Sequence, residues 1–242
     1  MGRTLVIGDI HGAYKALEQL IGRAEIKKDD KLVFLGDYVD GWGQSPQVID
    51  YLLQLDKKYE CVFVRGNHDD LLLSWLKTGK YNDEWFIHGG RITTENYNEL
   101  EDDIKQVHIA FLERLKDYHL DDDNRLFIHA GFTSLNGIGH EHFTRLFYWD
   151  RTLWETALAL DKTMETDHPY YPKRFTLYKE IFIGHTPVTR IDKTTPVQMA
   201  NVWNVDTGAA FKGPISIMDV ATKEFWQSDA VCTLYPEENG RN

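Results

Sequence analysis

Five short segments of the chain combine glycine with aspartate, histidine or asparagine. Carboxylate oxygen and imidazole nitrogen without thiolate suit manganese, iron or zinc, and calcium is less favoured because several imidazoles are present. A single segment of this kind is as well explained by a turn in which Asp or Asn bonds its own backbone. Five together predict a metal site: Gly8-Asp9-Ile10-His11-Gly12, Gly36-Asp37-Tyr38-Val39-Asp40, Gly66-Asn67-His68-Asp69, His129-Ala130-Gly131 and Gly184-His185-Thr186.

Each of these segments follows a short apolar run that is typical of a buried strand, directly or, for Gly66-Asn67-His68-Asp69, after one residue. In open α/β sheets, ligands bind at the carboxyl ends of the strands, so the five segments are expected to converge in space. The neighbouring glycines allow a tight turn and a close approach of backbone to a ligand. The five predicted strands are Leu5-Val6-Ile7, Leu32-Val33-Phe34-Leu35, Cys61-Val62-Phe63-Val64, Leu126-Phe127-Ile128 and Ile181-Phe182-Ile183.

Helical spacing of apolar residues follows the first three strands. One helix is expected through Leu17 and Leu20, a second with Ser45 as N-cap and Pro46 at its first position, and a third through Leu72 and Trp75. This alternation predicts parallel strands joined by right-handed crossovers, and therefore an α/β fold.

The remaining chain is read as part of the same domain, which is predicted to span residues 1–242. The more polar stretch at about 78–123 is predicted to be a helical insertion over one face, with a helix through Ile104, Val107, Phe111 and Leu115. After Val202 the pattern predicts several strands, interpreted as a second sheet.

Charge and hydropathy exclude several classes of partner. The 38 acidic and 27 basic residues give a formal charge of −11, so we expect no nucleic-acid or membrane partner, although a local basic pocket remains compatible with this balance. No apolar run reaches the length of a signal-peptide core or a membrane span, which predicts a cytoplasmic protein. Cys61 and Cys232 show no paired spacing and are expected to be inert.

The five segments resemble those of the calcineurin-like metallophosphoesterases, especially bacterial and phage members of the phosphoprotein phosphatase branch. The family pattern is GDxHG, GDxVDRG, RGNHE, HAG or HGG, and GHT; here it reads GDIHG, GDYVDG, RGNHD, HAG and GHT, in the same order. The match runs from about Thr4 to Gly208 and includes a shared segment that begins at Asn204. The resemblance implies a two-sheet α/β sandwich flanked by helices, the four-layer metallophosphoesterase fold.

The resemblance also implies two divalent metal ions, with Mn²⁺ expected first and iron or zinc as alternatives. Two such ions sharing a carboxylate would lower the pKa of a water molecule and bind phosphate oxygens for in-line displacement. Asp37 would bridge the two ions. The resemblance assigns the remaining ligands to Asp9 and His11 for the first ion and to Asn67, His129 and His185 for the second.

Two further residues would separate an enzyme from a simple metal site. The resemblance implies that His68 protonates the leaving oxygen and that Asp40 holds the His68 imidazole in the required tautomer. A metal-binding or interaction domain without catalytic activity would have no chemical need for such an acid, so this alternative is disfavoured.

Phosphate binding is expected to involve Asn67 and two arginines. Arg65 precedes the GNHD motif, and Arg151 follows Tyr148-Trp149-Asp150 where bacterial members have a phosphate-contacting arginine. A guanidinium can bind phosphate through two parallel hydrogen bonds. For Arg65 a structural ion pair is an equally good interpretation.

Two positions depart from the family pattern or imitate it. Gly41 stands where GDxVDRG has an arginine that usually touches the phosphate, which would leave the site one cation short. His88 lies in a His-Gly-Gly sequence but comes too soon after His68, so His129 is preferred as the ligand and His88 is read as a surface or substrate-facing residue. The other histidines, among them His108, are interpreted as surface residues.

The sequence therefore predicts a metal-dependent phosphomonoesterase, interpreted first as a protein phosphatase acting on phosphoserine, phosphothreonine or phosphotyrosine. Its partner would be a phosphorylated protein or a small phosphoester. The alternative is a hydrolase of dinucleoside polyphosphates or other nucleotides. The acidic balance and the glycine at position 41 weigh mildly against so highly charged a substrate.

Overall fold

The computed structural model describes residues 2–241, whose strands form two five-stranded sheets. The first sheet has the order β10-β9-β1-β2-β3, in which β1, β2 and β3 are parallel and β9 and β10 are antiparallel. Its strands are β1 (Thr4–Ile7), β2 (Lys31–Phe34), β3 (Glu60–Phe63), β9 (Ser216–Asp219) and β10 (Phe225–Gln227).

The second sheet has the order β4-β5-β6-β8-β7, with β5, β6 and β8 parallel and an antiparallel strand at each edge. Its strands are β4 (Tyr118–Leu120), β5 (Arg125–Ile128), β6 (Glu180–Ile183), β7 (Val197–Met199) and β8 (Val202–Asn204). All five strands predicted from the apolar runs are therefore present, with boundaries shifted by one residue at most of their ends.

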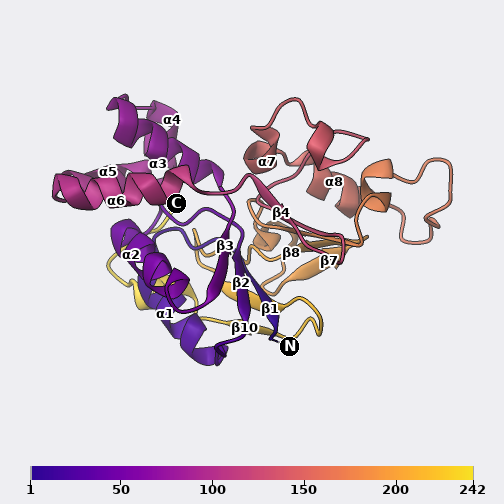
Figure 1. Ribbon diagram of the computed structural model, residues 1–242, viewed down its shortest axis with the longest axis horizontal. Helices are drawn as coiled ribbons and strands as arrows, with labels where there is room; N and C mark the ends of the chain where they lie inside the picture. The colour runs from indigo at the N-terminus through magenta and orange to yellow at the C-terminus, as the bar shows by residue number, and fades with distance from the viewer. Residues whose placement is uncertain (1, 242) are drawn as a thin grey trace.

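Helices cover the outer faces of both sheets (Figure 1). Those preceding β4 are α1 (Tyr14–Arg23), α2 (Ser45–Asp56), α3 (Asn67–Thr78), α4 (Asp83–Trp85), the single π-helical turn η1 (Phe86–Gly90), α5 (Arg91–Asn98) and α6 (Asp102–Glu113). The later ones are the short helix η2 (Ile138–His140), α7 (Leu146–Trp149), α8 (Thr152–Ala159), η3 (Lys173–Thr176), η4 (Val188–Ile191) and α9 (Val231–Leu234).

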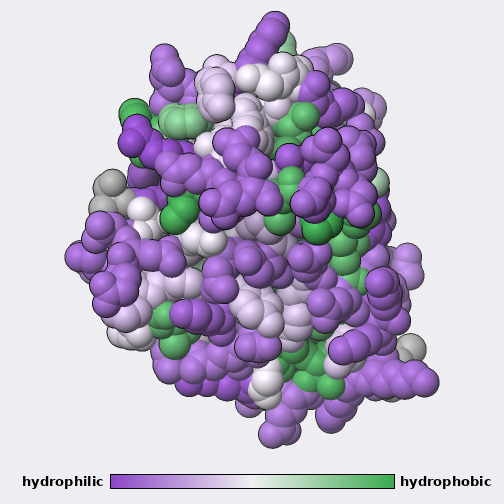
Figure 2. Space-filling model, turned by 90° about the vertical axis from the view of Figure 1, so that its left-hand side faces the viewer, coloured by the Kyte–Doolittle hydropathy of each residue, from purple (hydrophilic) through white to green (hydrophobic). Residues whose placement is uncertain are grey.

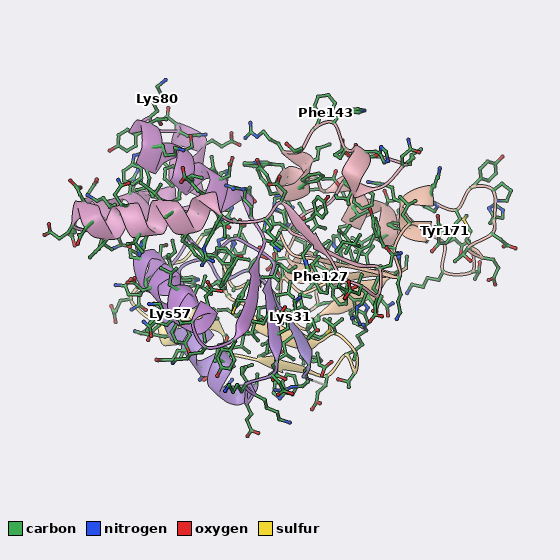
Figure 3. The ribbon with its side chains drawn as sticks, viewed as in Figure 1. Lys31, Lys57, Lys80, Phe127, Phe143 and Tyr171 are labelled. Atoms are coloured by element: carbon green, nitrogen blue, oxygen red, sulfur yellow. The ribbon has the colours of Figure 1, made fainter. Side chains whose placement is uncertain are left out.

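Alternation along the strands produces the layers. In β1, Leu5 and Ile7 pack against the helices of the first sheet, whereas Val6 packs against the other sheet. The Phe127 and Phe182 rings of the second sheet stack in the space between the sheets, with centroids 4.9 Å apart, and Figure 3 shows Phe127 in the interior. The result is the expected four-layer sandwich of helices, sheet, sheet and helices.

The helices of the first sheet turn their polar sides outward. In α1 the buried residues Ala16, Leu17, Leu20 and Ile21 form one stripe. Figure 2 looks onto this side of the molecule and shows a mostly hydrophilic surface with small, scattered hydrophobic areas. Within residues 2–241 there is no helix with the length and apolar character needed to cross a membrane.

The C-terminal strands differ from the prediction. Of the strands after residue 201, only β8 joins the second sheet, whereas β9 pairs antiparallel with β1 and extends the first sheet. An apolar pattern identifies a strand but does not say which sheet edge is free to accept it, so the assignment of this whole region to a second sheet was wrong.

The helical insertion also differs in detail. Of the residues predicted for this helix, Phe111 is buried, whereas Ile104 and Val107 are exposed and the buried face of α6 carries His108 and Leu112 in their place. His108 is fully buried, bonded to the Tyr97 hydroxyl at 2.9 Å and to Asp50 at 3.2 Å, so its interpretation as a surface residue was wrong. The sequence around His108 is polar, and a polar sequence does not distinguish a surface histidine from a buried one whose ring nitrogens both have polar partners.

Ser45, at the start of α2, contacts the loop after β2. Ser45 lies inside the helix, with Gln44 as N-cap, and makes no capping bond. Its hydroxyl accepts a hydrogen bond from the Asp40 backbone N–H at 3.1 Å and contacts the Thr93 hydroxyl at the same distance. Ser45 therefore holds the loop after β2 to the helical insertion.

Asp69, in the first turn of α3, joins the loops that follow β2 and β3. Its buried carboxylate accepts hydrogen bonds from the backbone N–H groups of Asp37, Tyr38 and Gly66, at 2.8–2.9 Å. One donor belongs to the predicted ligand Asp37, and the other two belong to residues adjacent to the predicted ligands Asp37 and Asn67. One carboxylate thereby fixes two of the loops that must carry those ligands.

We predict that Asp69→Asn lowers the free energy of unfolding by about 3 kcal/mol, because the amide nitrogen would face backbone N–H donors and leave them unsatisfied in the interior. Urea unfolding at pH 8 measures this, since burial and the charge of Asp37 raise the pKa of Asp69 to about 7 and the carboxylate is ionised there. Asp70→Asn, one position further along the helix and partly exposed, is the matched control and should change stability little. Equal effects of the two changes would contradict the role of Asp69.

Candidate metal centre

The structure brings the six predicted metal ligands together at the carboxyl ends of the central strands. All six side chains are buried, although they come from five loops spread over much of the chain. The convergence expected from the strand pattern is present. The six residues are Asp9, His11, Asp37, Asn67, His129 and His185.

Asp37 lies between two groups of these side chains. Its Oδ2 atom is 3.5 Å from His11 Nε2 on one side and 3.4 Å from His129 Nε2 on the other. His11 Nε2 also lies 3.7 Å from Asp9 Oδ2. A single carboxylate oxygen thus faces the imidazoles of both groups, as a ligand shared between two cations would.

The second group is completed by Asn67 and His185. The Asn67 Oδ1 atom lies 3.3 Å from His129 Nε2 and 2.9 Å from His185 Nδ1. The amide oxygen and His129 Nε2 can each donate a lone pair to a cation, and His185 can do so through one of its two ring nitrogens.

Backbone contacts orient the imidazoles. His11 Nδ1 is 3.2 Å from the Val39 carbonyl oxygen, and His129 Nδ1 is 2.8 Å from the Leu35 carbonyl oxygen. A proton on Nδ1 in each ring leaves the Nε2 lone pair directed at the site, the arrangement usual for metal-binding histidines.

Several predicted ligands have a strained backbone conformation. His11, Asp37 and His185 have φ values of 53°, 53° and 66°. Left-handed conformations of non-glycine residues cost about 1–3 kcal/mol each and collect at functional sites. Gly66 shows how tightly the loops meet, because a Cβ atom there would lie 2.1 Å from Asp37 Oδ1.

The buried carboxylates of the site carry more negative charge than the neighbouring side chains neutralise. Burial and the charge of Asp206 raise the pKa of Asp9 well above its usual value. Burial also raises the pKa of Asp206 to about 6, although the hydrogen bond from the Gly208 N–H opposes this shift. His185 Nε2 is buried and has no hydrogen-bond partner. Carboxylates crowded without enough cations, together with an orphaned imidazole nitrogen, fit a pair of divalent metal ions.

Asp206 was not among the predicted site residues. It is buried and lines the small cavity of about 40 Å³ at the centre of the ligands. The shared segment that begins at Asn204 contained the available signal, since it places a carboxylate just after a central strand.

His68 and Asp40 form a buried pair next to the ligands. His68 Nδ1 lies 2.6 Å from Asp40 Oδ2, and the same oxygen accepts a hydrogen bond from the Trp85 indole N–H at 2.5 Å. The backbone N–H of His68 donates to Asp37 Oδ1 at 3.0 Å. The far nitrogen of His68 is thereby free to face the centre, close enough to His11 and Asp37 to be a possible ligand as well.

The two predicted phosphate-binding arginines have different surroundings. Arg151 lines the cavities at the centre, and its guanidinium donates to the Thr186 hydroxyl at 2.8 Å. Arg65 lies 3.9 Å from Asp70 and 3.7 Å from Asp117 and lines neither cavity, which favours the structural ion pair for this residue.

A second cavity of about 560 Å³ adjoins the centre and shares Asn67, His68 and Arg151 with it. Its size is within the range of small-molecule sites. The other arginines of this cavity and Phe211 were not predicted, because none of them belongs to a motif. Exposed His88 lies on its wall, as one of the two interpretations allowed. The cationic and aromatic lining consists of Arg145, Arg151, Arg190, Arg241, Trp85, Trp149, Phe211 and His88.

Comparison with protein families gives a match over most of the chain. The family model described as calcineurin-like phosphoesterase matches residues 2–208. The bis(5'-nucleosyl)-tetraphosphatase PrpE of Oceanobacillus iheyensis, described as asymmetrical, is 29% identical over 91% of this chain and 89% of its own length. The PrpE protein of Geobacillus thermodenitrificans is 29% identical over 88% of both chains.

Solved structures share the fold at low identity. A crystal structure provisionally identified as a diadenosine tetraphosphatase has a TM-score of 0.64 and 20% identity, covering 95% of this chain and 94% of its own. A mutant of a cold-active protein tyrosine phosphatase has a TM-score of 0.61 and 15% identity, covering 95% and 81%. At such identities the likeness establishes the fold and leaves the substrate open.

We predict that Mn²⁺ binds the chelator-stripped protein more tightly as the pH rises from 6 towards 9, by up to about tenfold per unit. Burial would lower the pKa of His129, but the charge of Asp37 and the contact with it raise that pKa to about 9. Below that pH the metal must displace a proton. Calorimetric titration at pH 7 in two buffers of different ionisation enthalpy should show proton release; affinity independent of pH would contradict the prediction.

Proposed function

The chain belongs to the calcineurin-like phosphoesterase family, whose members are hydrolases with a dinuclear metal centre, and on this premise we propose that it hydrolyses dinucleoside polyphosphates. The observation that carries the proposal is the large cavity beside the metal centre, with four arginines and three aromatic side chains in its wall. Four phosphates joined to two nucleosides would match both kinds of lining, because guanidinium groups bind phosphate and aromatic rings stack on bases.

The relatives support this substrate class over the protein phosphatase that the sequence analysis favoured. PrpE proteins match along nearly the whole chain. A serine/threonine-protein phosphatase of Caenorhabditis elegans matches at 33% identity over only 42% of the chain. The mild objection from the net charge loses its force, since the arginines supply a local positive field within an acidic molecule.

The six ligands at the strand ends would hold the metal ions, and we propose Mn²⁺ for both positions. Bound there, the ions supply activation of water and neutralisation of charge on the transferred phosphoryl group. The Arg151 guanidinium donates a hydrogen bond to the Thr186 hydroxyl. Its remaining N–H groups would bind the phosphate and hold it in the orientation needed for in-line attack by water.

His68 would carry the proton for the leaving oxygen. The Asp40 carboxylate accepts a hydrogen bond from His68 Nδ1, which would leave His68 Nε2 as the proton-donating atom. The Trp85 indole N–H donates to the same Asp40 oxygen and fixes its position. A polyphosphate leaving group is a far weaker base than a serine alkoxide, so it needs less help from an acid. The role of His68 should therefore grow with the basicity of the leaving group.

We expect the manganese-restored enzyme to cleave diadenosine tetraphosphate into unequal products, a nucleoside triphosphate and a nucleoside monophosphate. Phosphoserine and phosphotyrosine peptides assayed in parallel should release phosphate much more slowly. Chromatography of the nucleotides and a phosphate assay make the comparison. Faster manganese-dependent release from a peptide would reject this proposal in favour of a protein phosphatase, with the metal centre unchanged.

We expect His68→Ala to lower kcat by about 10²-fold or more on a phosphoester with an alkoxide leaving group, and less on p-nitrophenyl phosphate. The backbone N–H that binds Asp37 is kept in this variant, so the manganese stoichiometry should stay unchanged. The exposed His142→Ala is the control. Loss of manganese from the His68→Ala protein would identify His68 as a ligand and remove its role as the acid.

A further inference from the structure

The side chain of Arg241 occupies the space next to Gly41. A Cβ atom on Gly41 would lie 3.2 Å from Arg241 Cγ, and one on Gly89 would lie 3.1 Å from the same atom. Gly41 has a φ of 97°, a conformation that an arginine at that position would adopt only under strain. The stem of Arg241 therefore runs where the side chain of residue 41 would begin.

The segment before Arg241 is fixed to the loop after β2. The Glu238 carboxylate accepts a hydrogen bond from the Gly43 backbone N–H at 2.7 Å, and the ring of Tyr235 lies 5.3 Å from the Trp42 ring. Gly240 is packed so closely that a Cβ atom would lie 2.8 Å from the Trp42 ring. These contacts attach residues 235–240 to the same loop that carries Asp37 and Asp40.

Arg241 itself is held by its backbone and directed by its side chain. Its N–H donates to the Ala210 carbonyl oxygen at 2.8 Å, and its guanidinium carbon lies 5.6 Å from the centre of the Phe211 ring. The residue lines both cavities at the metal centre. Its Nε atom is buried and has no hydrogen-bond partner, which is costly for a charged group unless a ligand supplies one.

Three guanidinium groups meet at this point. Arg151, Arg190 and Arg241 line the small cavity together, and burial with the charges of Arg190 and Arg241 lowers the pKa of Arg151. Like charges this close repel one another; Glu155 and Asp206 offset part of this repulsion, and an anion bound between the arginines would offset more of it. Predicted metal ligands, among them Asp37 and Asn67, line the same cavity, so an anion held there would lie beside the metal centre.

We propose that Arg241 binds the phosphate group of the substrate at the metal centre, taking the place of the arginine that position 41 lacks. The C-terminal segment is then part of the active site. This inference rests on the proposed phosphohydrolase function but does not depend on which phosphoester is cleaved.

The test is calorimetric titration of the manganese-loaded protein with inorganic phosphate. Arg241→Ala should raise the Kd for phosphate by about 10- to 100-fold, as expected for the loss of a charge-assisted contact. Arg241→Lys, which keeps the charge without the two-pronged geometry, should lie between the alanine variant and the wild type. The control is Lys57→Ala, which removes one positive charge from the exposed end of α2 (Figure 3) and should leave the Kd unchanged.

A second change separates the role of the guanidinium from that of the segment. Gly240→Ala should displace Arg241 and weaken phosphate binding, yet add nothing further in the Arg241→Ala background. Additive effects, an unchanged Kd in Arg241→Ala, or no phosphate binding by the wild type would overturn the inference. If phosphate binding depends on Arg241 while diadenosine tetraphosphate stays intact, only the proposed substrate is rejected.

Discussion

Burial of several carboxylates at one point between the two sheets is the constraint on which the arrangement of this protein depends. Asp9, Asp37 and Asp206 are each almost fully enclosed, and their mutual repulsion must be offset. His129 offsets part of it, since burial would lower the pKa of this imidazole but the charge of Asp37 and the contact with it raise that pKa to about 9, and the donor set fits cations for the rest. The strained backbone at His11 and Asp37 is the structural cost of this convergence.

The same constraint explains the polar contacts around the centre. Asp69 is a further buried carboxylate, but three backbone N–H groups donate hydrogen bonds to it. Asp69 therefore stabilises the loops, whereas the other buried carboxylates keep oxygen atoms available for a ligand. The carbonyls of Val39 and Leu35 perform the corresponding task for the imidazoles. Chemistry and support are thus provided by neighbouring positions of the same loops, which is why the motifs are short and recur after each strand.

What the sequence predicted reflects this locality. The predicted ligands and the pair formed by His68 and Asp40 lie in short motifs after buried strands. The strand pattern therefore placed these residues at one sheet edge, and the resemblance to a family pattern gave each of them its expected role. Arg190 shortly follows the GHT motif but matches no part of the family pattern, and Arg241 lies in a segment without periodicity, so the sequence did not identify either residue as lining the cavity. The sheet joined by β9 and the burial of His108 escaped prediction for the same reason, since both depend on non-local partners.

Trp85 has a consequence for how this fold diversifies. Its indole forms part of the wall of the large cavity, yet its N–H also holds the Asp40 carboxylate that orients His68. The proposed substrate binding and the proposed proton transfer would therefore share one side chain, contributed by the helical stretch after α3. Replacing that stretch with the one from a related enzyme, in order to change substrate selectivity, would also remove the Trp85 contact that positions Asp40 and the proposed acid His68. Selectivity and proton transfer could then not be altered independently in this chain.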